Sequence, residues 1–289
     1  NIGDRHLAAR LDNPHRVLDI HFRLTGKIVD ELEWSFWKDW HFCTRTREIP
    51  SFRGSNANLA VAPVWSRVVL DGPNKDLDKL GKLLVGLISA ARRRVCIMTP
   101  YFLPTYDLIG ALIAAHLRGV EVTILLAGKN NIPLAHWASQ NILLQILEHD
   151  IEIYYQPAPF IHSKLMLIDD IYSLMGSANI DQRSLRLNYE IGVELFSEAV
   201  NQELSLYFEV RRAGAEPKDM ALLLTVWSDA AIYEGATRTE AARIGGITLQ
   251  VVRDWVLRLN SLGPAGLIDR KARGKAALLT AEHRSALAQ

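Results

Sequence analysis

Between residues 76 and 155 the sequence alternates amphipathic helical patterns with short apolar runs, and this alternation restricts the fold more than any other feature. Apolar residues recur at helical spacing in residues 76–94, 106–119 and 133–149. Runs typical of buried strands occupy residues 95–99, 120–126 and 151–155. Strands that alternate with helices of about a dozen residues are typical of βαβ units. The sequence therefore predicts an α/β domain in which a mixed, mainly parallel sheet lies between layers of helices.

Shorter patterns extend this domain on both sides. Strand patterns without helices between them occupy residues 164–169, 171–176 and 190–196. Upstream, the alternation in LDIHFRLTG (18–26) predicts a half-buried strand, and residues 27–40 predict a helix whose aromatic side chains belong to the core. Residues 44–75 are rich in turn signals and predict loops. We expect the α/β domain to occupy residues 1–209.

Residues 210–289 form a second predicted domain with a different composition. They carry 12 Lys and Arg against 8 Asp and Glu, a net charge of +4, whereas residues 1–209 carry 21 against 24, a net charge of −3. Helical patterns at residues 220–235, at 239–243 and from 248 onward are interrupted by glycines. These features predict a small all-α helix-turn-helix segment whose basic character suits DNA.

The composition excludes several other classes of protein. Cys43 and Cys96 are the only cysteines, so neither a disulfide framework nor a thiolate zinc site is expected. The sequence has no apolar run near 18 residues, and it therefore predicts no membrane span. We also expect no cofactor.

The strongest chemical signal is IHSKLMLIDDIYSLMGSANIDQR, residues 161–183. His162 and Lys164 are two residues apart, so they share one face of an extended strand. A second strand that ends near Ser177 and Asn179 can return beside them. An imidazole, an ammonium, a hydroxyl and a carboxamide at one end of a sheet form a natural phosphate site. The alternative is a buried structural histidine beside an exposed lysine.

Each of these residue types has a role in phosphoryl transfer. The neutral imidazole of His162 can attack phosphorus, while Lys164 and Asn179 stabilise the charged oxygens of the transferred group. Glu190 can hold the imidazole in the required tautomer. Asp169 follows the strand in a turn, where a structural role is expected. Since the cationic donors do the work of a divalent ion, no metal is required.

The spacing HxKxxxxDxxxxxxGSxN resembles the HKD motif of the phospholipase D superfamily. Further likeness to the C-terminal half of bacterial cardiolipin synthases lies in residues 99–104, 117–131, 136–139 and 177–190. NIGD at residues 1–4, together with residues 18–40, resembles the part of those enzymes that follows a first motif copy. The resemblance covers about residues 1–200. It implies a phosphatidyltransferase that acts through a phosphohistidine intermediate on the hydroxyl of a glycerol headgroup.

The resemblance also assigns roles to residues of this sequence. The motif itself consists of His162, Lys164 and Asp169; Ser177 and Asn179 line the phosphate site, and Glu190 supports the histidine. Family members use two motif copies, one histidine attacking and the other protonating the leaving oxygen. The sequence itself does not say which histidine attacks first; the family suggests the upstream one, which would leave His162 as the general acid.

This sequence has one motif copy and begins with NIGD, which resembles the end of a first copy. We therefore expect the first His-x-Lys to lie upstream of Asn1, so that this polypeptide alone is nearly inactive unless two copies pair as a homodimer. The implied substrate is a phosphatidylglycerol-like lipid at a membrane surface, and the implied location is peripheral, on the cytoplasmic side of the plasma membrane. Two alternatives remain: a phosphodiesterase or nuclease of the same superfamily, and a DNA-binding module with an inactive passenger domain.

The basic segment has a resemblance of its own. TRTEAARIGG and RDWVLRLNSLGPAGLIDR, within residues 237–270, resemble the DNA-binding domain of insertion-sequence transposases. The residues expected to contact DNA are Arg253, Arg258, Arg270 and Lys271. The two resemblances together suggest a truncated lipid synthase fused in frame to the start of a transposase.

Overall fold

The computed structural model describes residues 16–46, 64–73, 76–128, 142–218, 237–240 and 249–262. The chain divides into two units, residues 1–218 and residues 219–289. The first unit contains the α/β domain that the sequence predicts, and its last helix continues past residue 209.

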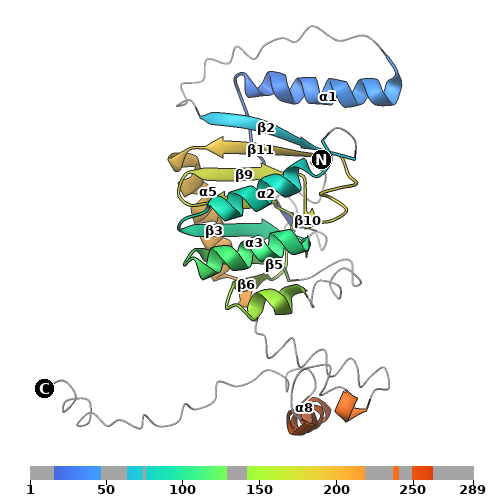
Figure 1. Ribbon diagram of the computed structural model, residues 1–289, viewed down its shortest axis with the longest axis vertical. Helices are drawn as coiled ribbons and strands as arrows, with labels where there is room; N and C mark the ends of the chain where they lie inside the picture. Colours follow the sequence, from blue (N-terminus) through green and yellow to red (C-terminus); the bar gives the residue numbers. More distant parts are fainter. Residues whose placement is uncertain are drawn as a thin grey trace, which may run out of the picture. The chain divides into compact units, whose positions relative to one another are not determined.

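An eight-stranded mixed sheet is the framework of the first unit (Figure 1). Its strand order is β12-β6-β5-β3-β8-β9-β11-β2. In that order the strands are Glu216–Pro217, Glu152–Gln156, Glu121–Ala127, Arg94–Thr99, Leu165–Ile168, Tyr172–Gly176, Glu190–Phe196 and Trp65–Asp71. Two-residue strands also pair outside this sheet, β1 (Val17–Leu18) with β7 (Phe160–Ile161) and β4 (Phe102–Leu103) with β10 (Ile180–Asp181).

The α/β class and the mixed sheet are confirmed, but the expectation of a mainly parallel sheet is wrong at the level of strand pairs. In the described sheet β3 pairs with β5, and β5 with β6, in parallel, while the other five neighbouring pairs are antiparallel. The reason lies in the connections. A parallel pair needs a long crossover such as a helix, whereas the turn between β8 and β9 spans only residues 169–171 and allows an antiparallel return.

Two strand predictions upstream of the motif are also corrected. The loop-rich region 44–75 contains β2, which pairs with β11 along its whole length, from Asp71 opposite Glu190 to Trp65 opposite Phe196. The strand expected at residues 18–26 is limited to β1. Its apolar side chains Ile20 and Leu24 still pack against the core, because burial of a side chain does not require a backbone ladder.

Helices cover both faces of the sheet (Figure 1). Helices α2 (Lys79–Ala90) and α3 (Tyr106–Leu117) lie on one face, and α5 (Glu198–Ala213) lies on the other. Helices α2 and α3 occur where the apolar periodicity of residues 76–94 and 106–119 predicts them. Ser197 caps α5 by accepting a hydrogen bond from the backbone N–H of Val200 at 3.4 Å. The helix predicted at residues 133–149 is seen over residues 142–147, and its first part lies outside the described residues.

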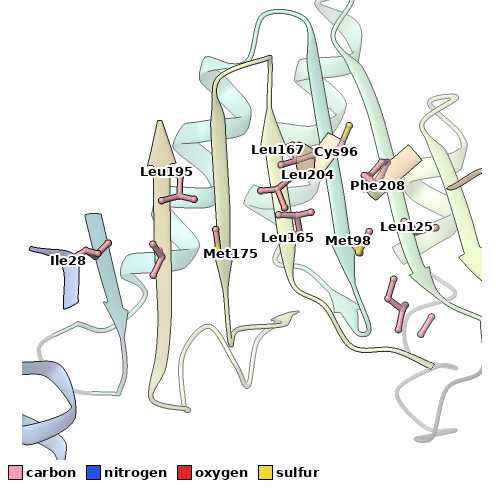
Figure 2. Packing of buried hydrophobic residues seen from close by; sticks show 13 residues of the cluster. Ile28, Cys96, Met98, Leu125, Leu165, Leu167, Met175, Leu195, Leu204 and Phe208 are labelled. Carbon is pink, nitrogen blue, oxygen red and sulfur yellow. The ribbon is translucent and has the colours of Figure 1, made fainter. Parts of the chain in front are cut away.

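The apolar core between the sheet and α5 holds the strand that follows His162 and Lys164 (Figure 2). Leu165 and Leu167 of β8 contact a cluster that includes Leu204 and Phe208 of α5. Phe208 is 1% exposed, and full burial of such a side chain contributes roughly 1.5–3 kcal/mol. The start of β8 is therefore held firmly, which fixes the backbone on which the catalytic candidates depend.

Helix α1 (Ile28–Thr44) packs through one side only. Ile28 is buried, and Leu32 packs against the core cluster. The prediction that its aromatic residues belong to the core is wrong, since Trp34 and Phe36 are each 56% exposed. These residues occupy other directions around the helix than Ile28, so a single contact face cannot bury them.

In the second unit, the described residues form two pieces of helix. The backbone N–H of Thr237 donates to Glu240 Oε2 at 2.8 Å, and the N–H of Glu240 donates to Thr237 Oγ1 at 3.3 Å. This reciprocal pair is a capping box, which starts the short helix expected there. Helix α8 (Leu249–Leu262) matches the predicted second helix of the motif. The helix expected at residues 220–235 lies outside the described residues.

Candidate active site

His162 and Lys164 lie in the short link between β7 and β8. The backbone N–H of His162 donates to the carbonyl of Leu18 at 2.7 Å, which ties this link to the segment that precedes α1. Leu165 pairs with Met175 across β8 and β9. Both ends of the link are thus anchored, and the two polar side chains are left to face each other.

The imidazole of His162 connects a carboxylate to an ammonium. Its Nδ1 lies 3.2 Å from Asp19 Oδ2, and its Nε2 lies 2.9 Å from Lys164 Nζ. Lys164 Nζ also donates to the carbonyl oxygen of His162 at 2.6 Å. The His162 side chain remains 44% exposed, so a substrate can approach it. The prediction that His162 and Lys164 share one face agrees with these contacts.

The two partners of the imidazole determine its tautomer. An ionised Asp19 only accepts hydrogen bonds, so Nδ1 must carry the proton. A protonated Lys164 only donates, so Nε2 must offer its lone pair. The nitrogen with the available lone pair therefore faces the cation that can bind a phosphate. This arrangement is suited to a nucleophile and equally to an acid–base group that cycles through its imidazolium form.

Asp19 is the residue that the sequence reasoning missed, and its contact corrects the role expected of Glu190. The carboxylate on Nδ1 belongs to Asp19, 143 residues before the histidine. Glu190 instead accepts hydrogen bonds from the hydroxyl of Ser177 and, at 3.1 Å, from Nδ2 of Asn188. In the sequence, Asp19 stands out only as a carboxylate near the start of the alternating segment 18–26. Its distance from the motif along the chain follows no known pattern, so nothing in the sequence indicates a pairing with His162.

Burial and charge act on the two partners of His162 in different ways. Burial lowers the pKa of Lys164 from 10.5 to about 8, although the charges of Asp19, Glu190 and Asp181 oppose this shift. Burial raises the pKa of the Asp19 carboxyl, but hydrogen bonds from His162 and from the backbone of Ile20 more than offset it. The pKa of Asp19 therefore lies below its usual value. Near neutral pH the pair is a carboxylate and an ammonium.

Ser177 links the second strand to Glu190. Its hydroxyl donates to Glu190 Oε2 and accepts from the backbone N–H of Ile191 at 3.1 Å. The preceding Gly176 lies against the same strand, and a Cβ at this position would overlap the carbonyl oxygen of Ile191. Glycine in the GSxN part of the motif is therefore required by the close approach of β9 and β11.

The side chain of Asn179 is half-buried, and its amide nitrogen makes a hydrogen bond. Its Nδ2 donates to Ser184 Oγ at 3.4 Å, and Ser184 is itself bonded through its backbone N–H to Asp181 Oδ1 at 2.7 Å. Asn179 Oδ1 is buried and has no hydrogen-bond partner within the described part of the chain. No hydrogen bond between described residues joins Ser177 or Asn179 to His162 or Lys164.

Asp169 has structural contacts. Its Oδ1 accepts hydrogen bonds from three consecutive backbone N–H groups, those of Arg92, Arg93 and Arg94, at 3.2, 2.7 and 3.1 Å. It also adopts a φ of 51°, in the left-handed region that Asp tolerates better than most residues. The carboxylate joins the turn after β8 to the start of β3 and so fixes the strand that follows the catalytic link.

Two further features of the described residues bear on the chemistry. They contain no group of three His, Cys, Asp or Glu side chains placed to hold a metal ion. None of the helices seen in the described ranges is both long and apolar enough to cross a bilayer.

Comparison with known families identifies the domain that carries this site. Residues 84–211 match the family described as cardiolipin synthase, PLD-like domain. This stretch of the chain is therefore similar to the phospholipase D-like domain of that family. His162, Lys164, Asp169 and the GSxN segment all lie inside the match, and the resemblance inferred from the motif is confirmed.

The relatives of this domain are bacterial cardiolipin synthases. The chain is 31% identical to cardiolipin synthase 1 of Staphylococcus epidermidis over 72% of its own length and 43% of the relative. It is 33% identical to cardiolipin synthase A of Pseudomonas entomophila over 73% of its own length and 44% of the relative. The chain thus spans less than half of the length of these proteins.

Among solved structures, the phospholipase D family member Nuc from Salmonella typhimurium superimposes with a TM-score of 0.47 at 21% identity. The superposition covers 54% of this chain and 99% of Nuc.

The second unit matches a different family. Residues 230–285 match the winged helix-turn-helix family, which confirms the predicted motif. Arg253 and Arg258 lie exposed on α8, whereas Arg270 and Lys271 lie outside the described residues. The transposase origin of this segment stays a prediction.

Proposed function

We propose that the protein is a phosphatidyltransferase of the cardiolipin synthase type, which acts through a phosphohistidine intermediate. The observation that carries the proposal is the contact of His162 with both Lys164 and Asp19. It provides a histidine with a defined tautomer beside a half-buried cation, in a chain that is 31% identical to a cardiolipin synthase over 216 residues. Ser177, Asn179 and Glu190 line the same phosphate site, and the charge of Glu190 acts on Lys164.

The reaction takes place in two displacements at phosphorus. In the first, a histidine nitrogen forms a bond to the phosphorus of a phosphatidylglycerol, and the bond from phosphorus to the glycerol oxygen breaks. A second histidine protonates that oxygen as glycerol leaves. In the second, the free hydroxyl of another phosphatidylglycerol attacks phosphorus, loses its proton to the second histidine and releases the first. Lys164 stabilises the negative charge on the phosphoryl oxygens in both steps.

His162 takes one of these two roles. By analogy with the family it is the general acid, which must enter the first step as an imidazolium with a proton on Nε2. The hydrogen bond to Asp19 supports this role because an ionised carboxylate stabilises the imidazolium, and the neutral tautomer with its lone pair on Nε2 is the form that takes up the proton in the second step. The nucleophile then comes from a first motif copy upstream of this sequence, or from a second copy of the chain in a homodimer. The site needs the second histidine, so we expect low activity from this polypeptide alone as a monomer.

The substrate also suggests where the protein works. A diacyl lipid is held in a bilayer, so we propose that the protein associates peripherally with the cytoplasmic face of the plasma membrane. Phosphatidylglycerol is the proposed lipid partner.

The test is product analysis with phosphatidylglycerol vesicles. We expect cardiolipin and free glycerol in equal amounts, and none in vesicles without protein. If a homodimer supplies the second histidine, the specific activity rises with protein concentration. Cleavage of DNA without any lipid product would overturn the proposal and favour the nuclease alternative, since the same residues serve both reactions.

The winged helix-turn-helix match supports a second function for the other unit, sequence-dependent or general binding to duplex DNA. Arg253 and Arg258 are exposed on the helix that enters the major groove in such motifs. We expect the full chain to bind duplex DNA with an affinity that falls steeply between about 50 and 200 mM salt. The double variant Arg253→Ala, Arg258→Ala should bind more weakly with a shallower salt dependence, and His162→Ala should bind as the unmodified chain does. Absence of binding at low salt removes this function.

A further inference from the structure

A cavity of about 230 Å³ adjoins the two residues that contact His162. It lies between the segment that leads into α1 and strands β9 and β11. Lys164 and Asp19 both line it, and both bond to the imidazole, so the cavity opens at the place where a bound phosphate would sit.

The remaining lining of this cavity is mostly apolar. The apolar side chains are Ile20, Phe22, Leu24, Leu32, Met175, Ile191 and Val193. Met175 and Val193 face each other across β9 and β11 and belong to the core cluster (Figure 2). The cavity thus combines charged groups, Lys164 and Asp19, with aliphatic walls. A site of this kind suits an amphiphilic ligand, which has a polar and an apolar part.

One buried polar atom in the lining has no protein partner. Ser163 is 2% exposed and lines the cavity, and its Oγ makes no hydrogen bond to any part of the chain that the structure describes. A buried hydroxyl without a partner is unfavourable, and a ligand that accepts its hydrogen bond removes this penalty. An ester carbonyl is an acceptor of this kind that occurs within a few bonds of a phospholipid phosphate.

We propose that this cavity binds the glycerol ester region of a diacyl phospholipid whose phosphate contacts Lys164. Ser163 donates to an ester carbonyl, and Leu24, Leu32 and Val193 contact the first methylenes of an acyl chain. The inference deepens the proposed phosphatidyl transfer and rests on it for the nature of the substrate.

Charge and size narrow the class of ligand. Among the described lining residues, Lys164 contributes one ammonium and Asp19 one carboxylate, while His21 and Phe22 contribute one imidazole and one phenyl ring. A nucleic-acid backbone requires a run of cations interleaved with several stacking aromatic rings, which this lining does not provide. A volume of 230 Å³ is smaller than a typical pocket for a drug-sized molecule, about 300–1,000 Å³. The cavity therefore fits the ester region, and the rest of both acyl chains must lie outside it.

The experiment measures binding and is independent of catalysis. Titration calorimetry compares monomeric dihexanoyl phosphatidylglycerol with its deacylated headgroup, glycerophosphoglycerol. We expect the diacyl ligand to bind at least about tenfold more tightly, which corresponds to burial of roughly 55 Å² of apolar surface. Leu32→Trp fills the cavity from α1 and should reduce this ratio to near one while leaving headgroup binding unchanged.

Two further variants make the result specific. Val29→Trp is the matched control, because Val29 is half-buried on the same helix and packs against the same cluster without lining the cavity. It should keep the tenfold ratio. Ser163→Ala alters no packing volume of note and should lower affinity for the diacyl ligand about fivefold, with no change for the headgroup. If Leu32→Trp fails to fold, Ser163→Ala still tests the proposal.

The outcomes separate this inference from the proposed function. Equal affinity for the two ligands, or a ratio that survives both Leu32→Trp and Ser163→Ala, overturns the cavity proposal even if cardiolipin is formed. A tenfold ratio that Leu32→Trp abolishes and Ser163→Ala lowers about fivefold supports it even if the protein makes no cardiolipin, in which case the proposed transfer fails and the lipid site stands.

Discussion

His162→Ala is expected to lower cardiolipin formation by roughly 10³-fold or more, at unchanged lipid binding. The imidazole is the group at the site that can form a bond to phosphorus or move the proton of the leaving oxygen, and alanine can do neither. Binding is preserved because the phosphate is held by Lys164, and the variant removes no core side chain: the imidazole is 44% exposed. Radiolabelled phosphatidylglycerol makes a rate loss of this size measurable.

A second histidine variant provides the control for this prediction. His149 is exposed in the turn before β6, away from the motif in the fold, and His149→Ala should retain full activity. The test also separates the two roles of His162. A covalent phosphatidyl adduct on His162 would identify it as the nucleophile, and an adduct on another histidine that still forms in His162→Ala would identify it as the general acid. Activity of His162→Ala within tenfold of the unmodified protein would contradict both roles.

The parts of this structure that local sequence determines were predicted well. Helices α2 and α3 and strands β3, β5 and β8 follow directly from apolar periodicity. The shared face of His162 and Lys164 follows from their separation by two residues, although the backbone there is a link between strands and not part of one. A period of two positions side chains similarly wherever the chain is extended.

The parts that depend on contacts between distant segments were not predicted. Asp19 meets His162 across 143 residues, and no pattern in one sequence reports such a pair. The family resemblance assigned Glu190 to the imidazole, yet the pairing of β9 with β11 places it beside Ser177. Strand β2 was missed because the turn signals around it outweighed a short apolar run, and its pairing with the distant β11 cannot be inferred from local sequence.

The alkaline limit of activity should follow the ionisation of Lys164. Burial lowers the pKa of its ammonium to about 8, so the free protein loses this cation as the pH rises through 8. The ammonium stabilises the phosphoryl oxygens, so its loss should lower kcat/KM. The ionisation of Lys164 should leave kcat/KM constant below pH 8 and should lower it about tenfold per pH unit above pH 8. A bound phosphodiester favours the charged amine, so the corresponding limit in kcat should lie at higher pH.

Lys164→Met distinguishes this explanation from a general effect of alkali. The variant keeps the length of the side chain and removes its charge, so we expect a loss of about 10²–10³-fold at pH 7 and no alkaline limit from this group in the activity that remains. Lys82→Met is the matched control, since Lys82 is 76% exposed on α2, and it should reproduce the unmodified pH profile. A limit near pH 8 that persists in Lys164→Met would assign the ionisation to a different residue. Lys164 would then have to act by holding His162 through its hydrogen bond to Nε2, and not by its charge on the phosphate.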